Sequence, residues 1–222
     1  MTQAPVLVWD FDGTLVEAWQ DIATALNRAL ADADLLTATD ERIRSWIGDG
    51  LHHLVERALR HQGAATDLTA TVIDGFRHHY PLCCTERSRP FAGMRETLSA
   101  LAAHPMAVAS NKPYDLLQPM VAELGLGQHF DLVLGGDSVG VLKPDAAVLT
   151  HVAQHFDVAP SSLWMVGDSP VDVAAARAVG ARAIGCTWGL DDDSTLRAAR
   201  PDALVREPGE IVAVVKGAKR GA

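Results

Sequence analysis

The chain has 222 residues, of which 48% are hydrophobic and 21% charged, and its formal net charge is -9 at pH 7. This composition is ordinary for a globular protein and allows one large domain or a domain with an inserted subdomain. The negative charge argues against non-specific binding to nucleic acid or to an anionic membrane, because both require a positive face. No run approaches the ~20 apolar residues of a membrane span, and the N-terminus lacks the basic region of a signal peptide.

The cysteines indicate the compartment. The chain has three, Cys83, Cys84 and Cys186, and two of them are adjacent. An odd count with this spacing is a poor disulfide framework and predicts the reducing cytoplasm. A metal site at the adjacent pair is the alternative to our interpretation, which is that both are small apolar residues near a domain junction.

A short apolar run at residues 6–9 predicts a buried strand, because it is β-branched and aromatic and too short for a helix. The run ends in Asp10 and Asp12, followed by Gly13. Burying unpaired carboxylates is costly, so such a pair implies a bound cation, a proton in transit, or both. Ligands of α/β proteins bind at the carboxyl ends of strands, and we expect a site here.

Residues 16–85 show helical periodicity and no strand signal. We expect four helices, which begin near Ile22, at Asp40 as a cap, at Leu51 and near Leu68. This helical block interrupts an α/β pattern soon after its first strand.

Strands and helices alternate in the rest of the chain. Apolar runs predict strands at 106–109, 132–134, 163–166, 183–186 and 203–205. The predicted fold is a Rossmann-like, doubly wound parallel sheet with an inserted all-helical cap. We place the α/β core at residues 1–15 and 86–222 and the cap domain at residues 16–85. The basic tail at 216–222 is expected to fray.

Polar residues follow a second predicted strand. Ser110 and Asn111 come directly after residues 106–109, and their hydroxyl and amide groups can donate to phosphate oxygens. A simple helix-capping turn is the alternative. Lys143 precedes Pro144 at a helix start, where a positive charge opposes the helix dipole. A residue placed against local preference is a candidate for function.

Two more carboxylates surround the end of the strand at 163–166. Asp168 follows this strand, and Asp172 lies four residues further on. In a helix, this spacing places both acids near one face of the first turn. The alternative interpretation is an N-cap aspartate with an exposed partner.

Together, these segments resemble the four motifs of the haloacid dehalogenase (HAD) superfamily of phosphotransferases. The run from Asp10 to Thr14 resembles the first motif and Ser110 the second, while Lys143 resembles the third and Asp168 with Asp172 the fourth. Two departures are Ala146, where a second proline is frequent, and Glu17-Ala18, where many relatives carry Asp-Ser.

The resemblance implies a phosphatase mechanism, in which Asp10 is the nucleophile and Asp12 the general acid and base. An acid at position 12 is typical of the phosphatases, whereas the dehalogenases have none there. Ser110, Asn111 and Lys143 are expected to bind the phosphoryl group. Mg²⁺ is expected at Asp10, Asp12 (through its backbone carbonyl), Asp168 and Asp172.

The run from Trp46 to Leu51 is similar to part of the cap of bacterial phosphoglycolate phosphatases. This similarity implies a small phosphorylated metabolite, 2-phosphoglycolate, as the substrate of a monomer or homodimer. Arg44 is expected to reach the substrate carboxylate, with a solvated surface arginine as the alternative.

The sequence also allows other functions. The same cap could serve a phosphatase of a sugar phosphate, an amino-sugar phosphate or pyrophosphate. A phospho-acceptor receiver domain also combines strand-end aspartates with a lysine, but it is much shorter and has no helical insertion. A non-catalytic binding protein of the superfamily would be expected to lack the nucleophile or the lysine.

Overall fold

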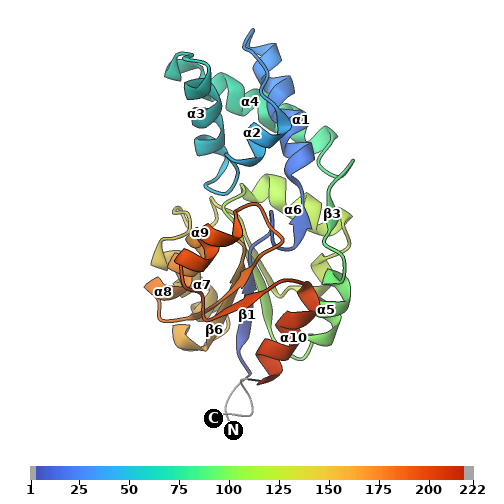
Figure 1. The fold of residues 1–222 in the computed structure, drawn as a ribbon, viewed down its shortest axis with the longest axis vertical. Coiled ribbons are helices and arrows are strands. Elements are labelled where there is room, and N and C mark those ends of the chain that lie inside the picture. The colour runs from blue at the N-terminus through green and yellow to red at the C-terminus, as the bar shows by residue number, and fades with distance from the viewer. Residues whose placement is uncertain (1–3, 218–222) are drawn as a thin grey trace.

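The computed structural model describes residues 4–217, and Figure 1 shows a helical part above a part built on a sheet. The sheet has six parallel strands in the order β5-β4-β1-β6-β7-β8. Its strands are β1 (Val6–Trp9), β4 (Met106–Ala109), β5 (Leu132–Leu134), β6 (Leu163–Gly167), β7 (Arg182–Cys186) and β8 (Ala203–Val205). The predicted α/β class with a doubly wound parallel sheet is confirmed.

The central strand β1 separates two hydrophobic cores. Leu7 and Trp9 pack on one face, against α5 (Met94–Ala100), α6 (Tyr114–Glu123) and α10 (Pro208–Gly217). Val6 and Val8 pack on the opposite face, against α7 (Ala146–His155), α8 (Pro170–Ala178) and α9 (Asp193–Ala198). The sequence analysis does not predict α9. A strand that is buried on both faces is continuously apolar, which explains the unbroken run that marks β1 in the sequence.

The helical part lies between β1 and β4 in the chain. It comprises α1 (Trp19–Asp32), α2 (Asp40–Arg44), α3 (Leu51–His61) and α4 (Thr69–His79), with short 3-10 helices at Thr66–Leu68 (η1) and Tyr80–Leu82 (η2). We call residues 19–82 the cap unit. Further 3-10 turns lie in the core at Gly127–His129 and Pro160–Ser162. The division at residues 16–85 remains our proposal for the domain boundary.

A second, small sheet lies where the cap unit joins the core. β2 (Val16–Glu17) pairs in antiparallel fashion with β3 (Arg89–Pro90). The expectation that residues 16–85 are entirely helical is therefore wrong at β2. Strands of two residues are too short to show an alternating pattern, and their pairing partner is distant in the chain.

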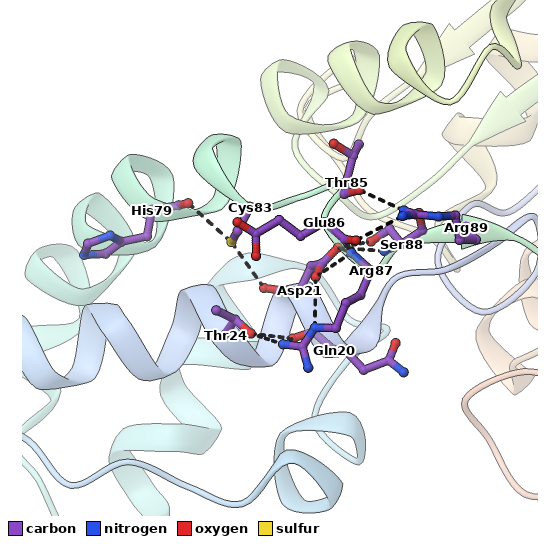
Figure 2. A network of polar contacts seen from close by, with 10 residues as sticks. All are labelled: Gln20, Asp21, Thr24, His79, Cys83, Thr85, Glu86, Arg87, Ser88 and Arg89. Carbon is purple, nitrogen blue, oxygen red and sulfur yellow. Dashed lines mark hydrogen bonds and ion pairs between the residues drawn. The ribbon is translucent and has the colours of Figure 1, made fainter.

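Asp21 ties this junction together, as Figure 2 shows. Its fully buried carboxylate, in the first turn of α1, accepts hydrogen bonds from the backbone N–H groups of Arg87 (3.0 Å) and Ser88 (2.7 Å). It also accepts one from the Ser88 hydroxyl at 2.7 Å. The chain that returns from the cap unit is thereby fixed to the helix that leaves the core.

The predicted cap at Asp40 and the alternative interpretation of Asp168 as a cap are each wrong by one residue. Thr39 caps α2 in place of Asp40: its backbone is extended, and its hydroxyl accepts from the N–H of Arg42 at 3.3 Å. Asp40 lies in the first turn, where its charge suits the helix dipole. Ser169 caps α8, which leaves the neighbouring Asp168 free for other contacts.

Within residues 4–217, no helix is both long and apolar enough to cross a bilayer. The last five residues of the basic tail, 218–222, lie outside the described part of the chain.

Candidate active site

The carboxyl ends of three adjacent strands carry the polar residues that the sequence singles out. Asp10 follows β1, Ser110 follows β4 and Asp168 follows β6. β4 and β6 both pair with β1, so these ends meet at one edge of the sheet. This is the place where open α/β sheets bind their ligands.

Three carboxylates converge at this edge. One oxygen from each of Asp10, Asp168 and Asp172 lies within 4.8 Å of the others. Burial, followed by the charges of Asp10 and Asp172, raises the pKa of Asp168 well above its usual range. Burial also raises the pKa of Asp172, although Lys143 opposes this effect. The cluster brings together negative charges that need a cation nearby.

Lys143 supplies part of that positive charge. Its Nζ lies 2.9 Å from Oδ1 of Asp10 and 2.7 Å from Oδ1 of Asp172. Burial alone would lower the pKa of Lys143, but the two carboxylates outweigh it and raise the pKa above its usual value. One ammonium cannot balance three carboxylates, and the remaining oxygen atoms are the hard ligands that a divalent cation such as Mg²⁺ prefers. The donor set therefore fits such an ion.

Neighbouring groups orient the two carboxylates of the fourth motif. Thr14 Oγ1 and the backbone N–H of Leu190 each donate to Asp168, both at 2.7 Å. The backbone N–H and hydroxyl of Ser169 donate to Oδ2 of Asp172 at 3.2 and 2.9 Å. These contacts fix the side chains in one orientation before any ligand binds.

Gly13 and Gly167 make room for the same carboxylates, and so does Gly189. A Cβ at Gly13 would lie 2.3 Å from Oδ2 of Asp168, and its φ of +88° also disfavours other residues. A Cβ at Gly167 would lie 2.2 Å from Oδ2 of Asp172. These glycines therefore allow the close approach that the cluster requires.

Ser110 and Asn111 have different surroundings. The Ser110 side chain lines a cavity above the cluster, and its oxygen accepts from the N–H of Lys112 at 3.3 Å. The Asn111 amide is used within the protein: it bonds both main-chain groups of Lys143 and donates to the carbonyl of Gly48 at 3.1 Å. Asn111 thus connects the lysine loop with the cap unit, and we propose a positioning role for it.

Asp12 lies beside a cation that the sequence analysis did not assign. Its Oδ2 is 2.9 Å from Nζ of Lys112. Asp12 and Lys112 both line the cavity, whereas the carboxylate cluster does not include the Asp12 side chain. Lys112 lies two residues after Ser110 in the second motif, and this position could have identified Lys112 as a residue of the site.

The cavity lies between the core and the cap unit and has a volume of about 50 Å³. The core contributes the polar side chains of Asp10, Asp12, Ser110, Asn111 and Lys112. The cap unit and the loop after α2 contribute an apolar wall of Ile22, Ile47, Leu51, Leu54 and Phe76. The cavity thus combines charged groups at its base with hydrophobic side chains above them.

Arg44 is not part of the cavity lining. Its guanidinium donates to the carbonyl of Gly189 at 2.7 Å and lies over the ring of Trp19, 5.9 Å from the centroid. In this arrangement Arg44 joins the cap unit to a core loop. Because Arg44 does not line the cavity, its predicted contact with the substrate stays a prediction.

Known proteins show the same organisation. Residues 7–186 match the family model of haloacid dehalogenase-like hydrolases. Phosphoglycolate phosphatase of Pectobacterium atrosepticum is 36% identical over 94% of this chain and 91% of that protein. Phosphoglycolate phosphatase of Chromobacterium violaceum is 37% identical over 95% of this chain and 96% of that protein.

A solved structure agrees with these relatives. The crystal structure described as a predicted phosphoglycolate phosphatase of Haemophilus somnus 129PT superimposes with a TM-score of 0.90. The two chains are 30% identical, and the match covers 96% of this chain and 99% of the other. The chain therefore belongs to the haloacid dehalogenase-like hydrolase family, as an enzyme of the phosphoric monoester hydrolase class.

Proposed function

We propose that this enzyme hydrolyses 2-phosphoglycolate to glycolate and phosphate through an aspartyl-phosphate at Asp10. The observation that carries the proposal is the convergence of Asp10, Asp168, Asp172 and Lys143 beside a cavity between the core and the cap unit. A carboxylate nucleophile needs this environment, because phosphoryl transfer depends on positioning and on neutralising the charge of the phosphoryl oxygens.

Asp10, Asp168 and Asp172 would hold Mg²⁺, with the backbone carbonyl of Asp12 as a further ligand. When bound, Mg²⁺ supplies the positive charge that lets an anionic carboxylate approach a phosphate dianion. Lys143, whose side chain is almost fully buried, adds a second positive charge 2.9 Å from Oδ1 of Asp10.

In the first step, an oxygen of Asp10 attacks phosphorus while the bond from phosphorus to the ester oxygen breaks. Asp12 gives a proton to the departing oxygen, which leaves as the alcohol group of glycolate. Ser110 and Lys143 bind the phosphoryl oxygens during this transfer. The product of the step is a phosphoryl group linked to Asp10.

In the second step, Asp12 takes a proton from a water molecule that attacks phosphorus. The bond between phosphorus and Asp10 breaks, phosphate is released, and the carboxylate of Asp10 is restored. One residue therefore serves as acid and then as base, which explains why a carboxyl group two residues from the nucleophile is needed.

The substrate assignment has two supports. The relatives that match along most of this chain are named phosphoglycolate phosphatases. The apolar wall that the cap unit gives the cavity favours a compact organic group over a hydroxyl-rich sugar. A sugar or amino-sugar phosphate would need hydrogen-bonding partners for its hydroxyl groups, since unpaired polar groups are costly to bury. From cysteine usage we expect a cytoplasmic enzyme, and we propose that it is a monomer or homodimer.

The test is phosphate release with Mg²⁺ from 2-phosphoglycolate and from a panel of sugar phosphates, amino-sugar phosphates and pyrophosphate. The proposal expects the highest kcat/KM for 2-phosphoglycolate and loss of activity after chelation of the metal. A higher kcat/KM for a sugar phosphate would retain the mechanism and contradict the substrate.

A further inference from the structure

Lys112 is a charged cavity residue to which the mechanism above assigns no role. Its side chain is 6% exposed, and its Nζ lies 2.9 Å from Oδ2 and 3.2 Å from Oδ1 of Asp12. Among the described residues that line the cavity, it is the one cation. An ammonium is costly to bury without a partner, and the Asp12 carboxylate is the partner that the structure gives Lys112.

A residue of the cap unit, Tyr80, contacts the ammonium of Lys112. Nζ lies 4.5 Å from the ring centroid of Tyr80, a distance suited to a cation–π contact. The ring stacks on Phe76 with centroids 5.0 Å apart, and its hydroxyl donates to Sδ of Met120 at 3.1 Å. Tyr80 is fully buried and fixed on several sides, so it holds the ammonium at one place in the cavity.

That place is next to the leaving group of the proposed substrate. Asp12 protonates the ester oxygen, and Lys112 contacts Asp12 directly. In 2-phosphoglycolate a single methylene separates the ester oxygen from the carboxylate. A substrate whose ester oxygen reaches Asp12 therefore brings its carboxylate close to Nζ of Lys112.

Other nearby cations are engaged elsewhere. Lys143 binds Asp10 and Asp172, and Arg44 donates to the carbonyl of Gly189. Arg57 binds Asp49 and also donates to the carbonyl of Trp46 at 2.7 Å. Lys112 is also paired, but its partner is Asp12, the residue that must carry a proton in the first step, and both residues line the cavity.

We propose that Lys112 binds the carboxylate of the substrate and sets the preference for a short phosphorylated carboxylic acid. The inference rests on the proposed function and names a residue that determines its specificity. The apolar surroundings strengthen the interaction, because charges attract more strongly where water is excluded.

The test compares 2-phosphoglycolate with 2-hydroxyethyl phosphate, in which a hydroxymethyl group replaces the carboxylate. Lys112→Met keeps the apolar stem and removes the charge. We expect kcat/KM for 2-phosphoglycolate to fall roughly 10- to 100-fold, mainly through KM, as for loss of one charge-assisted hydrogen bond. The value for 2-hydroxyethyl phosphate should change several-fold at most. Lys216→Met, the same change on exposed α10, is the matched control.

Several results would overturn the inference. An equal loss of kcat/KM on both substrates would mean that Lys112 acts through Asp12. An unchanged preference for 2-phosphoglycolate in Lys112→Met would show that Lys112 does not bind the substrate carboxylate. Collapse of the preference in Arg44→Met instead of Lys112→Met would assign the carboxylate to Arg44. Lys112→Arg should keep most of the preference, and Lys112→Gln replaces the methionine variant if that one does not fold. Failure of the wild-type enzyme to prefer 2-phosphoglycolate would instead contradict the proposed function.

Discussion

Asn111 holds both main-chain polar groups of Lys143. Its Oδ1 accepts from the N–H of Lys143 at 2.8 Å, and its Nδ2 donates to the carbonyl at 3.1 Å. The lysine loop after β5 has no strand or helix of its own at this position, so the amide takes the place of a regular backbone partner. The position of the ammonium beside Asp10 thus depends on a residue of a different loop.

Asn111→Ala should therefore reduce kcat by about 10- to 100-fold, the effect typical of losing a group that orients a site residue. KM should change less, because the amide does not have a free donor for the substrate. Steady-state kinetics with 2-phosphoglycolate measure both values. Loss confined to KM would show that Asn111 contacts the substrate directly.

Asp12→Asn should slow both half-reactions by about 10²- to 10⁴-fold with 2-phosphoglycolate, the range for loss of an acid–base group. With p-nitrophenyl phosphate, whose leaving group needs no proton, the first step should be slowed much less. A rapid-mixing experiment that follows p-nitrophenolate release separates the two steps. Equal slowing of the first step for both substrates would contradict the acid role of Asp12.

Gly13→Ala tests the crowding around Asp168. Gly93 is the matched control, because its φ of +79° resembles the +88° of Gly13 while nothing lies within 4 Å of a Cβ there. Both alanine variants should lose about 1–2 kcal/mol of unfolding free energy from the left-handed backbone, and Gly13→Ala should lose more because its Cβ also meets Asp168. Gly13→Ala alone should also weaken Mg²⁺ binding in titration calorimetry. Unchanged Mg²⁺ affinity in this variant would contradict the proposed metal site at Asp168.

Asp21→Ala should lower the free energy of unfolding by about 2–4 kcal/mol, because it leaves buried donors of Ser88 without partners. Asp32→Ala is the control on the same helix. Its carboxylate is 64% exposed and pairs with His79, so its loss should cost less than about 1 kcal/mol. Urea unfolding measures both variants. Equal losses would mean that the network in Figure 2 does not anchor the cap unit.

The parts of the molecule that depend on short sequence segments were predictable. β1 and β6 are continuous apolar runs that end in acids, and a fully buried parallel strand requires this pattern. Because parallel strands align their carboxyl ends, the fold class placed Asp10, Asp168 and Ser110 at one edge of the sheet, and the strand order in the structure makes them neighbours. The approximate extents of α3 and α4 followed from their apolar spacing.

The features that join the cap unit to the core were not predictable in this way. The β2–β3 pair, the contact of Arg44 with Gly189 and the place of Tyr80 above Lys112 join residues that are far apart in the chain. Each depends on how two packed units meet, which no local pattern encodes. The shift of the α2 cap from Asp40 to Thr39 has a different cause, since both residue types are suitable caps and the backbone angles decide between them.

The central claim is that Asp10 accepts the phosphoryl group, and trapping that intermediate tests it most directly. Asp12→Asn would be mixed with p-nitrophenyl phosphate and Mg²⁺, quenched in acid and digested for mass spectrometry. The account predicts phosphorylation of the peptide that contains Asp10, because the first step proceeds while its hydrolysis is slow, and it predicts none in Asp10→Asn/Asp12→Asn. Release of p-nitrophenolate without a phosphorylated peptide, or with the phosphoryl group on another residue, would contradict the account.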